Sequence, residues 1–110
     1  MQIAMKLDEI IKAVRIGTIN ELLDDYLRNI DYDKIIVYAE HTVSTDTNYR
    51  FFQFKRGLKE ILKEEDMWYE RLCSLKELSF LVNFFLRQYD RKTDDILAIE
   101  IIDYLYNHNF

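Results

Sequence analysis

The 110-residue chain has no proline, only two glycines (Gly17 and Gly57) and a single cysteine, Cys73. Hairpin-rich β folds and phosphate-binding loops both need glycine, whereas helices disfavour glycine and proline alike. The near absence of both residues therefore favours an all-α fold. A lone cysteine excludes a disulfide within the chain and is typical of a reducing compartment.

Long uncharged apolar runs are also missing. No segment approaches the roughly 20 apolar residues that a membrane-spanning helix needs. The N-terminal segment carries Lys6, Asp8 and Glu9 where a signal peptide would have its apolar region. We therefore expect a soluble cytoplasmic protein without a membrane segment.

The chain does contain enough apolar side chains to build a core. Hydrophobic residues make up 49% of it and aromatic residues 15%, a composition that disfavours intrinsic disorder. A chain of this length folds as one domain and buries roughly two thirds of its unfolded surface. We expect a single helical domain that spans residues 1–110.

The most apolar stretch, residues 67–90, predicts a central helix. Its apolar side chains recur at spacings of three and four residues, the period of a helix stripe that faces a core. Between Leu78 and Leu86 only Ser79 and Asn83 interrupt the apolar run, so this part is expected to be buried on most sides. The stripe comprises Trp68, Leu72, Leu75, Ser79, Val82, Leu86 and Tyr89.

Helix start and stop signals occur along the whole chain. Gly17 suits the C-terminal end of a first helix, and Thr18–Glu21 and Thr93–Asp95 have the form of helix starts. Asp66 is a candidate cap for the central helix, while Ser74–Glu77 offers a second capping box at which that helix could break. Together these signals predict a compact bundle of five or six helices.

Residues 34–55 fit two different structures. Ile35–Tyr38 and the Phe-rich segment 48–54 contain β-forming residues that could pair as a β-hairpin. The connection between them lacks glycine, however, and neither arm alternates cleanly, whereas the apolar residues from Phe51 to Leu62 fit the helical period. We prefer helices here and keep, as the alternative, an α+β fold with a β-hairpin at about 34–55.

No motif for catalysis or for metal binding is present. The sequence has no C-x-x-C, H-E-x-x-H, EF-hand, G-x-S-x-G or glycine-rich nucleotide motif. Cys73 lies among apolar neighbours, which is typical of an inert packed thiol. We expect no enzymatic activity, no metal and no cofactor.

One stretch, residues 49–59, interleaves aromatic with basic residues, as base stacking and phosphate contacts require. An amphipathic helix with a buried Phe side and a solvated basic side explains the pattern too. A net charge of −5 also disfavours affinity for phosphates. Nucleic-acid regulation is therefore the alternative function, and its basic face would comprise Arg50, Lys55, Arg56 and Lys59.

Acidic residues and tyrosines gather between residues 20 and 46, where Arg28 and Lys34 are the only bases. Tyrosine is favoured at protein interfaces because it combines a large rigid ring with a polar tip. Half-buried tyrosines beside an acidic, solubilising face would give the same pattern. We predict that a basic protein partner, for example one that handles nucleic acid, contacts Asp24, Asp25, Tyr26, Asp31, Tyr32 and Asp33.

The exclusion of catalysis leaves a binding role. We expect a small acidic protein-binding module that occupies a macromolecular partner, as inhibitors, immunity proteins and mobile-element antagonists do. So many apolar side chains in a short chain also predict a tendency to form homodimers, because dimers commonly bury apolar surface that one copy leaves uncovered.

Overall fold

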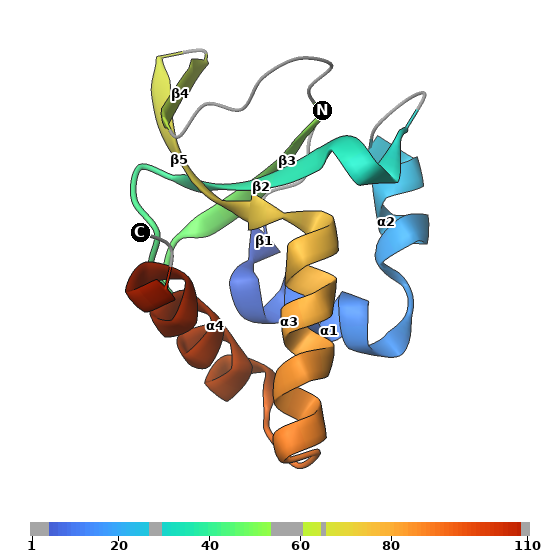
Figure 1. Cartoon of the computed structure of the whole chain (residues 1–110). Coiled ribbons are helices and arrows are strands. Elements are labelled where there is room, and N and C mark those ends of the chain that lie inside the picture. The colour runs from blue at the N-terminus through green and yellow to red at the C-terminus, as the bar shows by residue number, and fades with distance from the viewer. Residues whose placement is uncertain (1–4, 27–29, 54–60, 65, 109–110) are drawn as a thin grey trace.

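The computed structural model describes residues 5–26, 30–53, 61–64 and 66–108 and shows an α+β fold (Figure 1). The elements are β1 (Met5–Lys6), α1 (Leu7–Ile16), α2 (Ile19–Tyr26), the 3-10 helix η1 (Tyr32–Lys34), β2 (Ile35–Glu40), β3 (Asn48–Gln53), β4 (Ile61–Glu64), β5 (Met67–Ser74), α3 (Leu75–Gln88) and α4 (Asp94–His108). The predicted all-α bundle of five or six helices is therefore wrong.

The strands form one antiparallel sheet in the order β1-β3-β2-β5-β4. β2 and β3 pair as a hairpin, with Val37 opposite Phe51. The alternative of an α+β fold with a hairpin at about 34–55 thus agrees with the structure, and the helices preferred for this segment do not. Of the predicted helix between Phe51 and Leu62, residues 54–60 lie outside the described part of the chain.

Side chains, rather than glycine, shape the connection between β2 and β3. His41 adopts a left-handed backbone conformation with φ of 69°, a position that glycine often fills. The Thr47 hydroxyl donates a hydrogen bond to the Glu40 carbonyl at 2.7 Å. The buried Tyr49 hydroxyl donates to the Ser44 carbonyl at 2.7 Å and accepts from the Ser44 N–H at 3.2 Å. Because the connection contains no glycine, the sequence pattern did not indicate a hairpin turn here.

Residues 67–90 do not form one helix. The first part is β5, which lies between β2 and β4 in the sheet, and α3 begins only at Leu75. β5 buries Tyr69 on one face of the sheet and Leu72 on the other, and a strand buried on both faces cannot be told from a helix by periodicity. Asp66 is no helix cap, because it lies in the turn before β5 with φ of 66°.

The second capping box is the true start of α3. The Ser74 Oγ accepts a hydrogen bond from the Glu77 N–H at 3.0 Å, and the Glu77 carboxylate accepts one from the Ser74 N–H at 3.2 Å. Two other predicted boundaries are confirmed. Gly17 ends α1 with φ of 78°, and α4 begins at Asp94, where the Thr93 hydroxyl donates to the Asp95 carboxylate and lowers the pKa of Asp95.

The helices α1, α3 and α4 lie on one face of the sheet, and α2 lies beside its end (Figure 1). The core between sheet and helices includes Val37 of β2, Ile101 of α4, and Leu78 and Val82 of α3, all of which are fully buried. We expected Leu78, Val82 and Phe85, in the most apolar stretch of the chain, to be core residues; this is confirmed for Leu78 and Val82, and Phe85 is partly buried beside them. A smaller cluster on the opposite face of the sheet contains Ile36, Tyr38 and Tyr69.

Candidate functional site

The predicted partner-binding residues lie on α2 and η1, which Figure 1 shows at the same end of the molecule. The Tyr32 hydroxyl donates a hydrogen bond to Asp24 Oδ1 at 2.7 Å and so joins the two elements. We call this region the acidic surface. Its described, exposed side chains are Asp24, Asp25, Asp31, Tyr32 and Asp33. Tyr26 belongs to α2, but its side chain lies outside the described part.

Hydrogen bonds fix η1 to the sheet. The Asp31 N–H donates to Gln53 Oε1 of β3 at 2.7 Å. Asp31 Oδ1 caps η1 by accepting from the Asp33 N–H at 3.2 Å, and Asp31 Oδ2 lies 3.8 Å from the Lys34 ammonium. The ion pair is exposed and therefore weak. The backbone that carries Asp31 and Asp33 is thus anchored to β3.

Tyr32 acts as a hydrogen-bond donor within this surface. Its hydrogen bond to the Asp24 carboxylate raises the pKa of the Tyr32 phenol above its usual value. The side chain remains partly accessible, with 36% of the residue exposed. The surface therefore offers negative charge around an aromatic ring, an arrangement suited to binding cationic groups.

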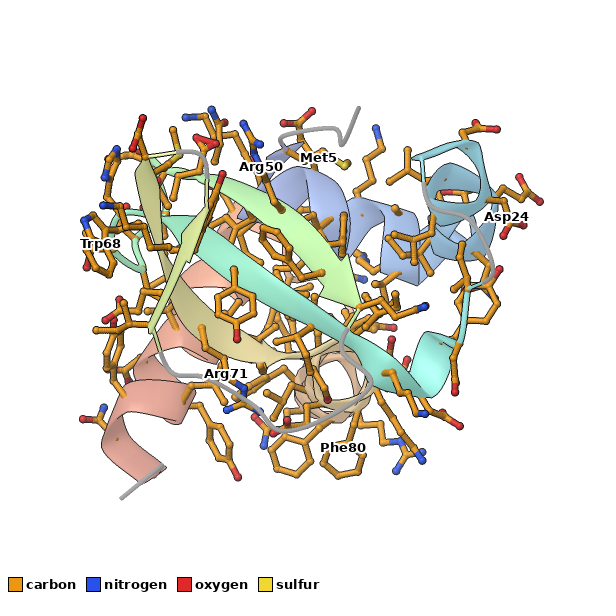
Figure 2. All side chains as sticks on the ribbon, turned by 90° about the horizontal axis from the view of Figure 1, so that it is seen from above. Met5, Asp24, Arg50, Trp68, Arg71 and Phe80 are labelled. Atoms are coloured by element: carbon orange, nitrogen blue, oxygen red, sulfur yellow. The ribbon has the colours of Figure 1, made fainter. Side chains whose placement is uncertain are left out.

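The alternative basic face is described only at Arg50, because Lys55, Arg56 and Lys59 lie outside the described residues. Arg50 projects from β3 (Figure 2). Its Nε lies 3.1 Å from Glu40 Oε2, and its guanidinium lies 5.7 Å from the centre of the Tyr69 ring. Its charge is thus compensated within the protein, which weakens the case for a phosphate contact.

The most exposed aromatic side chains of α3 were not predicted as surface residues. Phe80 is 66% exposed and Phe84 is 41% exposed, and their rings stack with centroids 6.2 Å apart. Exposed Glu77 precedes this pair and exposed Arg87 follows it. We call Glu77, Phe80, Phe84 and Arg87 the outer stripe of α3, and Figure 2 shows Phe80 and Asp24 at different margins of the molecule.

A hollow of about 440 Å³ lies beside the outer stripe, between α3 and α4. Phe80 and Leu81 line it from α3, and Tyr104 and Leu105 line it from α4. Behind it, the Phe85 ring meets the Tyr104 ring edge-on with centroids 6.0 Å apart. An apolar hollow beside projecting aromatic rings is a feature of protein-binding surfaces.

The expectation that residues 78–86 are buried on most sides is wrong, because α3 has two apolar stripes and the rest of the described fold covers only one. A signal for the second stripe was present in the sequence. Glu77 and Arg87 lie on the same stripe as the two phenylalanines, and charged residues at both ends of an apolar stripe are typical of a surface.

Other candidate chemistry finds no support. Cys73 is 1% exposed, and burial raises the pKa of its thiol, so the reactive thiolate is suppressed. Within the described residues, no three His, Cys, Asp or Glu side chains come together as a potential metal site. No helix in the same part of the chain has the length and apolar character needed to cross a membrane.

No protein family, curated protein or solved structure matches this chain.

Proposed function

We propose that this protein is a small binding module that occupies a positively charged protein partner, and that the acidic surface is the contact site. The observation that carries the proposal is the 2.7 Å hydrogen bond between the Tyr32 hydroxyl and Asp24. It brings residues of α2 and η1 into one surface, which the sequence could suggest only as a cluster along the chain.

The acidic surface has the anatomy of a small contact site. An exposed tyrosine at the centre can be covered by a partner and supply a large share of the binding energy. Carboxylates at the rim act mainly on the association rate and on its dependence on salt. Asp24, Asp25 and Asp33 are exposed and available for this role, and Asp31 also holds η1 in place.

Charge defines the class of partner. A surface of carboxylates is attracted to lysine- and arginine-rich patches, which occur on proteins that hold nucleic acid. A protein that covers such a patch would compete with the nucleic acid, as an inhibitor, an immunity protein or a mobile-element antagonist does. We also propose a cytoplasmic location, which the single, buried Cys73 supports.

Matched charge removal tests the proposal. A tagged copy would first capture its partner from lysate of the native host, and binding kinetics would then compare two quadruple variants. Asparagine can still accept the hydrogen bonds from the Tyr32 hydroxyl and the Asp33 N–H, so the surface keeps its shape. The test variant replaces Asp24, Asp25, Asp31 and Asp33 by Asn, and the control replaces the exposed Asp46, Asp66, Asp90 and Asp103 by Asn.

We expect the test variant to associate several-fold more slowly at low salt and the control to associate much as the parent does. Tyr32→Ala should raise the dissociation rate about tenfold, as loss of a binding hot spot does, whereas Tyr89→Ala at another exposed tyrosine should not. Equal rates for both quadruple variants would contradict the proposal. Retention of the parent protein on heparin would instead favour the nucleic-acid-binding alternative.

A further inference from the structure

We propose that two copies of this chain pair through the outer stripe of α3, with the two helices antiparallel about a two-fold axis. Phe80 and Phe84 present much of their ring surface to water, although they lie in the middle of a long and well-capped helix. Apolar surface of this kind is commonly buried by a partner.

The spacing of the stripe suits a second helix. Its four residues, Glu77, Phe80, Phe84 and Arg87, are separated by three, four and three positions, so they form one row along the helix. The same alternation of three and four produces the contact row of two helices packed side by side. A helix is therefore the natural occupant of this face.

Charge then identifies the helix and its direction. The Phe80–Phe84 pair and the Glu77–Arg87 pair are both centred on residue 82. If a second α3 runs antiparallel and the two-fold axis lies level with residue 82 along the helix, Phe80 faces Phe84 of the second copy. Glu77 then faces Arg87 of the second copy. A parallel arrangement would place Glu77 against Glu77 and Arg87 against Arg87, which is repulsive.

Two further exposed residues of α3 agree with this register. Lys76 and Gln88 are also centred on residue 82, so the lysine faces a neutral amide and no like charges meet. Glu77 keeps its place in the capping box, and its Oε1 lies 3.4 Å from Arg71 NH2 within the same copy. More than half of the Glu77 side chain is still exposed and can face a second molecule.

The hollow beside the stripe makes the face self-complementary. Phe80 projects at its rim, and Leu81, Tyr104 and Leu105 line its wall. A two-fold interface uses the same patch on both copies and so needs a projection and a hollow side by side. In the antiparallel pair, Phe84 of each copy lies against Phe80 at the rim of the other copy's hollow.

The interface is small, and this sets the expected strength. The 14 residues of α3 span about 21 Å, so we expect the buried area to fall at the lower end of the roughly 1,200–2,000 Å² typical of stable interfaces. We expect a dissociation constant on the order of 10 μM. The pairing involves none of the residues of the acidic surface and does not depend on the proposed function.

Analytical ultracentrifugation between about 1 and 300 μM would test the pairing. The parent should shift from monomer to dimer across this range, whereas Phe80→Ser should stay monomeric. Arg87→Glu places a new carboxylate against Glu77 of the second copy and should weaken the dimer at least tenfold. The matched control is Arg91→Glu, an equal charge change at an exposed position beyond the end of α3, which should leave the dimer intact.

Mixing gives the sharpest test of the contact. Glu77→Arg alone should also be monomeric, but an equal mixture of Glu77→Arg and Arg87→Glu should dimerise, because each contact then joins a glutamate to an arginine. Glu77→Arg removes the capping box of α3, so circular dichroism would confirm that this variant is folded. The Arg87→Glu and Arg91→Glu variants leave the capping box intact and test the register independently of Glu77→Arg. A parent that stays monomeric at 300 μM would overturn the proposal, as would equal dimerisation of the Arg87→Glu and Arg91→Glu variants.

Discussion

The two sides of α3 carry similar side chains in opposite surroundings. Leu78 and Val82 lie in the core and have no accessible surface, whereas Phe80 and Phe84, on the other side of the same helix, are 66% and 41% exposed. Burial of apolar surface stabilises a fold by about 25 cal/mol per Å². Leu78 and Val82 therefore contribute the full area of their side chains to the stability of the fold, whereas Phe80 and Phe84 contribute only the part that is buried. The apolar character of a helix thus does not show which side the fold uses.

The largest difference between the two sides should appear when a charge is introduced. Val82→Asp places a carboxylate in the core without a partner and should remove most of an unfolding free energy of about 5–15 kcal/mol. Asn83→Asp, one residue further along at an exposed position, should change it by less than about 1 kcal/mol. Chemical denaturation would compare the two variants. A folded Val82→Asp protein with near-parental stability would show that the inner side is not the core.

Truncation should reveal the same contrast on a smaller scale. Leu78→Ala removes a fully buried side chain and should cost about 2–5 kcal/mol, whereas Phe80→Ala should cost less than about 1 kcal/mol for the monomer. Denaturation at submicromolar concentration, followed by the fluorescence of the single tryptophan, Trp68, would exclude any contribution from dimers. Comparable costs for the two variants would contradict the difference in burial.

A smaller effect on stability should distinguish the buried Tyr49 from the surface residue Tyr32 at alkaline pH. Burial raises the pKa of Tyr49 far above its usual value of 10. The unfolded chain loses this proton near pH 10 while the folded protein keeps it, so the free energy of unfolding should fall as pH rises above 10, by up to about 1.4 kcal/mol per pH unit. Urea titrations at several pH values would measure this decline.

Tyr49→Phe removes the titrating group. This variant should be less stable at neutral pH, because it loses the hydrogen bonds to Ser44, and its stability should fall less steeply above pH 10. Tyr32→Phe, at a hydroxyl on the acidic surface, should retain most of the parental decline. An unchanged pH dependence in Tyr49→Phe would assign the effect to other groups.

Local signals in the sequence predicted several features correctly. Gly17, the Ser74–Glu77 capping box and Thr93–Asp95 each mark a helix boundary in the structure. These signals work because capping depends on residues only a few positions apart. The residues proposed for partner binding could also be named from the sequence, since they cluster along the chain, but the Tyr32–Asp24 bond that joins α2 to η1 could not.

The sequence by itself determined the composition of a core, the boundaries of several helices and the clustering of acidic residues, because each depends on neighbours in the chain. Tertiary structure decided that residues 67–74 form a strand, since β5 is stabilised by pairing with β2 from far along the chain. It also decided which side of α3 is covered. Burial is settled by the elements that pack against a side chain: Val82 lies in the core cluster shared by the sheet and the helices, whereas none of the described elements covers most of the Phe80 ring.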